Sequence, residues 1–271
     1  MIIDFHTHIF PDKIAKRTID LLSEKGGIPP FSDGTVNGLI EKMEQSGVDI
    51  SVTLPVLTNP SQFESVTRFA TEINESFSNK EKRLISFAGI HPKCENIEDK
   101  MLFIKKSGFL GVKIHPDYQG TFIDDPAYIK ILQCAKEYDL IVVTHSGADG
   151  AFRGMPIKCT PDRVLNLLKK VKHSKLVLAH CGANEMFNEV FDKLCGLDVY
   201  FDTAYILRFI EPELFKKIVK KHGEDKILFA SDSPWSDIQN DVEILKSFSL
   251  DKTTENKIFF ENASKLLGLQ I

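Results

Sequence analysis

The sequence lacks any apolar run of the roughly 20 residues that a membrane span requires, and no segment at its start resembles the apolar part of a secretory signal. The five cysteines, at positions 94, 134, 159, 181 and 195, form no Cys-x-x-Cys pair and are too sparse for a disulfide framework. A formal net charge of −4 gives no reason to expect nucleic acid or an anionic membrane as a partner. We therefore expect a cytoplasmic protein with reduced thiols.

Linkers, low-complexity tracts and short repeats are absent as well, so nothing in the chain suggests a point at which to divide it. With 271 residues, 42% apolar and 27% charged, the composition is ordinary for a globular protein. We expect one large α/β domain over residues 1–271.

What the sequence does contain is a repeated alternation of apolar, β-branched runs with helical patterns. Strands are expected over residues 2–8, 48–54, 84–90, 109–115, 140–145, 175–180, 197–203 and 227–232. Helices are expected over 13–25, 36–45, 61–78, 97–106, 126–138, 161–171, 184–194, 211–222, 238–248 and 261–267. Several strands are continuous apolar runs, which is typical of parallel strands that are buried on both faces.

Eight strands, each followed by a helix, predict a (β/α)₈ TIM barrel. A doubly wound open sheet has the same periodicity and is the alternative. The strand ends favour the barrel, because polar or ionisable residues recur there: His8, His91, Lys113, His115, His145, His180, Asp202 and Asp232. In a barrel these ends converge on the C-terminal mouth, where this fold carries its chemistry.

The start of the chain holds two of these residues in an unusual arrangement, Asp4-Phe5-His6-Thr7-His8. Alternate residues of a strand share a face, so Asp4, His6 and His8 are expected to point the same way. Two imidazoles at a strand end can bind one metal ion. A His-x-His pair also arises by chance in a chain with eight histidines, so the motif alone does not establish a metal site.

Three further strand-end residues, His145, His180 and Asp232, complete the pattern. A single histidine at such a position is more often structural, but five convergent His and Asp residues favour a metal site. Imidazole and carboxylate donors suit Zn²⁺, and also Mn²⁺, Fe²⁺ or Co²⁺, without any thiolate. We expect one divalent metal ion per chain, with Zn²⁺ as the first choice.

Motifs along the whole chain then point to a family. They run from residue 3 to residue 269: Ile3-Asp4-Phe5-His6-Thr7-His8, Gly111-Val112-Lys113-Ile114-His115-Pro116, His145, Ala179-His180-Cys181-Gly182, Ala230-Ser231-Asp232-Ser233-Pro234-Trp235 and Asn262-Ala263-Ser264-Lys265-Leu266-Leu267-Gly268-Leu269. This set resembles the amidohydrolase superfamily of metal-dependent (β/α)₈ hydrolases. It resembles most its amidohydrolase-related branch, which includes the aminocarboxymuconate-semialdehyde decarboxylase-like enzymes. The resemblance implies that His6, His8, His145 and Asp232 bind the metal and that His180 orients or activates the metal-bound water.

Binuclear members of that superfamily place a carbamylated lysine at the end of the fourth strand, where this chain has Lys113. His115 lies on the same face, one step nearer the mouth. Because the branch that the chain most resembles works with a single metal, we expect an unmodified Lys113 and a pocket residue at His115.

The loops after the strands are expected to supply the pocket walls. The predicted substrate-binding residues are Lys113, His115, Arg153, Tyr205, Arg208 and Trp235. Either arginine could bind a carboxylate through two hydrogen bonds or be a solvated surface charge. Two residues are expected to be catalytic: His180 polarises the substrate carbonyl, and Asp232 takes up a proton and delivers it. Asp4 is expected to accept a hydrogen bond from a ligand histidine.

Three functions are open at this point. The favoured one is a metal-dependent hydrolase that attacks a C–N or C–O bond of an amide, cyclic amide, lactone or ester through a metal-activated water. The alternatives are a metal-dependent non-oxidative decarboxylase or lyase of a small carboxylic acid, and a non-catalytic barrel that binds metal or ligand. Hydrolysis is favoured because 271 residues leave little chain beyond the barrel to enclose a larger aromatic acid. The expected partner is a small-molecule substrate, and a homodimer is an open alternative.

Overall fold

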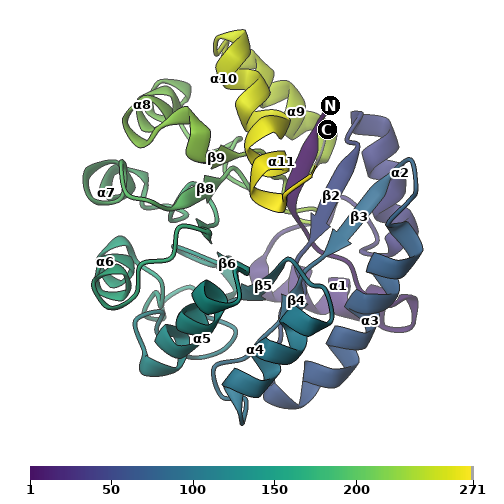
Figure 1. Cartoon of the computed structure of the whole chain (residues 1–271). Coiled ribbons are helices and arrows are strands. Elements are labelled where there is room, and N and C mark those ends of the chain that lie inside the picture. The colour runs from purple at the N-terminus through teal and green to yellow at the C-terminus, as the bar shows by residue number, and fades with distance from the viewer. Residues whose placement is uncertain (270–271) are drawn as a thin grey trace.

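A computed structural model describes residues 1–269 of the chain, so the last two residues of the predicted domain lie outside it. Its strands are all parallel and pair in the orders β1-β2-β3 and β4-β5-β6-β7-β8-β9. Their bounds are β1 (Ile3–Thr7), β2 (Ile50–Thr53), β3 (Arg83–Ser86), β4 (Ala88–Gly89), β5 (Gly111–Ile114), β6 (Ile141–Thr144), β7 (Leu176–Leu178), β8 (Tyr200–Asp202) and β9 (Ile227–Leu228). Figure 1 shows them as a ring seen along its axis.

Main-chain hydrogen bonds close this ring into a barrel. β3 and β4 are one strand interrupted at Phe87, whose N–H still donates to Thr53 of the neighbouring strand at 3.0 Å. On the other side, the N–H of Phe5 donates to Phe229 at 2.9 Å, and the N–H of Asp232 donates to His6 at 2.8 Å. The (β/α)₈ barrel is therefore confirmed over the open sheet.

Most of the helices surround the barrel on its outside, as Figure 1 shows, while α1 and α11 lie across its two ends. Their bounds are α1 (Asp12–Gly26), α2 (Val36–Ser46), α3 (Phe63–Phe77), α4 (Ile97–Lys106), α5 (Pro126–Glu137), α6 (Pro161–Lys170), α7 (Phe187–Lys193), α8 (Pro212–His222), α9 (Ile238–Ser247), α10 (Lys252–Asn256) and α11 (Asn262–Leu267). Short turns of other helix types lie at Pro60–Gln62, Gly150–Phe152 (η2), Glu224–Lys226 and, as a π-helix, Lys257–Glu261.

Local sequence explains several helix ends. The Thr35 hydroxyl accepts the N–H of Gly38 at 3.0 Å, which is the cap predicted for α2. A proline occupies the first turn of α5, α6 and α8, where its missing N–H costs nothing. The helix predicted from residue 184 begins only at Phe187, because Glu185 has a φ of 61°, which a right-handed helix cannot include.

Two ends of the barrel are closed differently. Inside it, apolar side chains from the strands pack with Ala263, Leu266 and Leu267 of α11, which closes the end where the strands begin. Side chains of α1 and of the loops that follow the strands surround the opposite end, the mouth. In Figure 1, α1 passes behind the strands instead of taking a place in the outer ring of helices. The mouth is therefore a cavity that α1 partly covers.

Candidate metal centre

A cavity of about 970 Å³ fills the mouth of the barrel. Every residue predicted to bind metal, substrate or water lines it, with the exception of Arg208. These residues come from the ends of β1, β5, β6 and β7 and from the loops after β6, β8 and β9, so the barrel geometry brings them together from distant parts of the chain.

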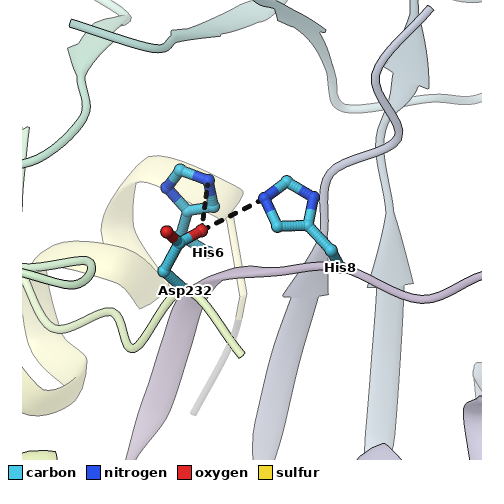
Figure 2. A group of neighbouring side chains, drawn as sticks. All are labelled: His6, His8 and Asp232. Carbon is cyan, nitrogen blue, oxygen red and sulfur yellow. Dashed lines mark ion pairs between the residues drawn. The ribbon is translucent and has the colours of Figure 1, made fainter. Parts of the chain in front are cut away.

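Three of the predicted ligands meet at one point of this cavity. One ligand atom each of His6, His8 and Asp232 lies within 4.8 Å of the other two. Oδ1 of Asp232 is 3.4 Å from Nε2 of His6 and 3.2 Å from Nε2 of His8. Figure 2 marks these two ion pairs with dashed lines. Two imidazole nitrogens and a carboxylate directed at a common point are a donor set that suits a divalent ion.

The other nitrogen of each imidazole is held from behind. Nδ1 of His8 donates to the carbonyl of Leu54 at 2.8 Å, and Nδ1 of His6 lies 2.9 Å from Oδ2 of Asp202. Burial raises the pKa of Asp202 to about 6, so its carboxylate is mostly ionised at neutral pH and accepts the hydrogen of His6. Such partners fix the tautomer that leaves Nε2 free to bind a metal.

Lys113 lies against the same centre. Its Nζ is 2.9 Å from Nε2 of His6, and the side chain is 1% exposed. Burial lowers the pKa of Lys113 to about 8, although Asp202 and Asp232 nearby oppose the shift. The predicted pocket position is thus observed, while the predicted absence of a carbamate stays a prediction.

His180 and His145 form a second part of the site. Nδ1 of His180 donates to the carbonyl of Ala204 at 2.9 Å, so its Nε2 accepts a hydrogen bond from Nδ1 of His145, also at 2.9 Å. His145 therefore contacts His180 and does not belong to the group of His6, His8 and Asp232 in this structure. Its role as a fourth ligand stays a prediction.

Two buried atoms bear on that role. Nε2 of His145 and Oδ2 of Asp117 face each other at 3.9 Å, and neither has a hydrogen-bond partner among the described residues. With the proton on Nδ1, both atoms are acceptors, and buried unpaired acceptors are unfavourable. If Nδ1 of His145 instead bound a metal ion, the proton would lie on Nε2 and could be donated to Asp117. The unpaired atoms therefore fit a divalent metal at this centre.

A second cluster, His115, His145 and Asp149, also has ligand atoms within 4.8 Å of one another. The rings of His115 and His145 are stacked, with centroids 4.1 Å apart and planes 7° from parallel. A metal bonds in the plane of an imidazole, and two stacked rings cannot both direct such a lone pair at one ion. His115 is therefore better described as a pocket residue, as the sequence predicted.

Asp4 does not do what the sequence predicted. Its carboxylate accepts main-chain and hydroxyl hydrogens of Ser231 at 2.9 and 2.5 Å and the main-chain N–H of His6 at 3.2 Å, not the ring. The register between β1 and β2 shifts between Asp4 and Thr7, which breaks the alternation on which the prediction depended. Asp202, noticed only as a strand end, holds the ring of His6 instead.

Arg208 lies outside the cavity lining. Its guanidinium donates to the carbonyl of Trp235 at 2.8 Å and packs on the ring of Tyr205, 4.8 Å from the centroid. It supports two residues of the wall. Arg153 does line the cavity, as do Tyr205 and Trp235.

The wall contributed by α1 was not predicted. Seven of its residues line the cavity, among them Ile14, Arg17, Leu21 and Lys25. Ile14 and Leu21 are 50% and 60% exposed, whereas Ala15 and Ile19 are buried. The sequence did contain a signal for this wall, because α1 has apolar residues on two faces. A helix that only packs on the barrel needs one apolar face.

Among residues 1–269, no helix is both long and apolar enough to cross a membrane. The amidohydrolase family model matches residues 3–269. The chain therefore belongs to the amidohydrolase family, and the resemblance drawn from its motifs is confirmed.

Solved structures share the fold over nearly the full chain. The 2,6-dihydroxybenzoate decarboxylase from Rhizobium is 15% identical, with 98% of each chain covered and a TM-score of 0.70. A dihydroxybenzoic acid decarboxylase from a Polaromonas species, with bound manganese and the inhibitor 2-nitroresorcinol, is 14% identical, with 98% of this chain and 96% of that chain covered and a TM-score of 0.72. A protein called amidohydrolase II is 17% identical, with 99% and 100% covered and a TM-score of 0.71. No curated protein matches the chain.

Proposed function

We propose that the chain, as one catalytic domain, is a metal-dependent, non-oxidative decarboxylase of a small aromatic carboxylic acid. The observation that carries this proposal is the convergence of His6, His8 and Asp232 inside a cavity with largely apolar walls. The likeness to decarboxylases of dihydroxybenzoates supports it better than it supports hydrolysis.

The reason for favouring hydrolysis from the sequence was wrong. A short chain was expected to leave no room for an aromatic acid, yet the cavity measures about 970 Å³. The extra wall comes from α1, which crosses the mouth. Aromatic and aliphatic side chains line the chamber, among them Phe10, Leu22, Val56, Phe69, Phe152 and Trp235. Such walls suit the flat, apolar body of an aromatic ring.

In the proposed reaction, the bond between the ring carbon and the carboxyl carbon breaks and CO₂ leaves. The electron pair stays on the ring carbon, which takes up one proton, so no external oxidant or reductant is required. When bound, a divalent ion would act as a Lewis acid toward oxygen atoms of the substrate. The residues proposed to hold it are His6, His8, His145 and Asp232. Zn²⁺ remains the prediction from the donor set, and manganese in a relative makes Mn²⁺ the second choice.

Other side chains have separate tasks in this proposal. Asp232 delivers the proton, because its carboxylate lies at the centre and lines the cavity. His180, fixed by the carbonyl of Ala204, orients the substrate. Arg17, Lys25 and Arg153 line the cavity and supply the positive charge that attracts an acid.

The test is turnover of 2,6-dihydroxybenzoate and related acids by protein loaded with Mn²⁺ or Zn²⁺, in D₂O and separately in ¹⁸O-labelled water. We expect one CO₂ per product, one deuterium on the ring carbon and no ¹⁸O in the organic product. Asp232→Asn should abolish turnover, while Asp241→Asn, a buried carboxylate outside the cavity lining, should leave it unchanged. Turnover of ester, lactone or amide probes with ¹⁸O in the product and no CO₂ release would make the protein a hydrolase.

A further inference from the structure

Asp202, the last residue of β8, is fully buried, and its two carboxylate oxygens have different partners. Oδ2 lies 2.9 Å from Nδ1 of His6. Oδ1 accepts the main-chain N–H groups of His180 at 2.8 Å and Ala204 at 3.1 Å. One side chain therefore touches a residue of the proposed metal centre and also the main chain of His180.

The position of the proton on the His6 ring is fixed from both sides. Lys113 as an ammonium group has only donors, so Nε2 of His6, 2.9 Å away, must accept. A neutral imidazole that accepts at Nε2 carries its hydrogen on Nδ1, and that hydrogen points at Asp202. The lone pair on Nε2 consequently faces the side on which Oδ1 of Asp232 lies at 3.4 Å.

We propose that Asp202 is a positioning residue whose carboxylate keeps His6 in the tautomer that can bind a metal ion through Nε2. The inference rests on the proposed metal centre, although the interaction itself is present without an ion. Mutation of a carboxylate that orients a ligand imidazole in this way typically lowers metal affinity about 10- to 100-fold.

The second oxygen links this role to the turn that follows β7. His180 and Cys181 have φ values of 61° and 53°, a region that residues other than glycine rarely adopt. The N–H of His180, bound to Oδ1 of Asp202, helps to hold that turn. The same carboxylate therefore fixes the ring of His6 and the base of the His180 side chain.

Asp202→Asn is the informative variant, because the orientation of its amide is determined. The amide oxygen must stay with the two main-chain N–H groups, so the NH₂ group faces Nδ1 of His6. Nδ1 must then accept, and the ring proton moves to Nε2, where Lys113 accepts it as a neutral amine and where it blocks metal binding. In metal-free protein labelled with ¹⁵N-histidine, we expect NMR to show Nδ1–H for His6 in the wild type and Nε2–H in the variant. The affinity for Mn²⁺ should fall about 10- to 100-fold.

Asp241→Asn is the matched control. Asp241 is 1% exposed, but its carboxylate oxygens have no hydrogen-bond partner among the described residues. This variant should change neither the tautomer of His6 nor the Mn²⁺ affinity. A purely structural role would lower the melting temperature of metal-free Asp202→Asn and leave the tautomer as it is. That result would overturn the proposal. If the tautomer of His6 changes in Asp202→Asn but the wild-type protein itself binds no metal, the proposed function would be rejected. Asp202 would still be the residue that sets the tautomer of His6.

Discussion

Replacing His8 with alanine tests the metal centre with the least damage to the fold. Within residues 1–269, the His8 ring makes one hydrogen bond, from Nδ1 to the carbonyl of Leu54, beside its ion pair with Asp232, and its side chain is 13% exposed. His6 would be a poorer choice, because its ring lies between the buried groups of Asp202 and Lys113. Removing one partner of a buried charged pair lowers the free energy of unfolding by about 3–5 kcal/mol. In a His6 variant, the effect of losing the metal could therefore not be separated from the effect of losing stability.

The size of the effect follows from linkage. A metal ion at a hundred times its dissociation constant stabilises the folded chain by about 2.7 kcal/mol. At ~2.1 cal/mol/K per residue, unfolding 271 residues carries an entropy of roughly 0.57 kcal/mol/K. Loading the wild type should therefore raise its melting temperature by about 5 °C. If His8→Ala weakens binding a hundredfold, the shift at the same metal concentration falls below about 1 °C.

The assay is calorimetry of stripped and reloaded protein, combined with elemental analysis of the dialysed chains. His91→Ala is the control, because His91 is also a buried histidine at a strand end but does not line the cavity. It should keep the full metal-induced shift. The double variant His6→Ala/His8→Ala should contain no metal. A His8→Ala protein with the wild-type shift and about one metal per chain would refute the assignment.

Three further outcomes are expected. Burial lowers the pKa of His222 to about 4, and its Nδ1 accepts the N–H of Gly196 at 3.2 Å. As the pH falls, His222 therefore takes up its proton at a higher pH in the unfolded chain than in the folded one. Stability should then decline from about pH 6.5 towards pH 4, by up to about 1.4 kcal/mol per pH unit, in denaturant titrations, and His222→Gln should flatten that slope. Gly147→Ala should lose about 3 kcal/mol or more of unfolding free energy, since a Cβ there would lie 2.1 Å from the main-chain nitrogen of Asn184 and φ is +85°; an unchanged urea midpoint would contradict this. Lys113 should carry no carbamate, so ¹³C NMR of loaded protein in labelled bicarbonate should show no carbamate signal, and a structure with two metals bridged there would contradict the single-ion prediction.

Much of the fold could be predicted because parallel strands that are buried on both faces are continuous apolar runs. The runs at 140–145 and 175–180 became β6 and β7, shortened at their ends. The segment 252–260 was missed, although it forms α10 and nearly all of the π-helix. Its first half, Lys252-Thr253-Thr254-Glu255-Asn256, has no apolar period, and the cap that begins it, Asp251, was the only local signal.

The convergence of the site residues could be predicted, because the C-terminal ends of barrel strands meet at one mouth. Their partners could not. The hydrogen bond between His6 and Asp202 joins β1 to β8, which lie far apart in the sequence. The shift of register in β1 could not be predicted either, because the prediction assumed that residues of a strand alternate regularly between its two faces. Arg208 was expected in the pocket but turns to the carbonyl of Trp235. The size of the cavity depends on where α1 crosses, which is a property of tertiary packing.

The main-chain contacts that close the barrel between β1 and the segment after β9 also bring together the residues of the proposed metal centre, and this orders events during synthesis. Asp232 and the strand before it are made after His6 and His8, with Asp232 following His8 by 224 residues. At about 5–20 residues per second, the two imidazoles wait roughly 10–45 s for their carboxylate. A chain released before that point can neither close its barrel nor assemble the three-residue group. Metal loading should therefore require translation beyond Asp232, and nascent chains stalled ahead of that residue should bind the ion no better than an unfolded peptide.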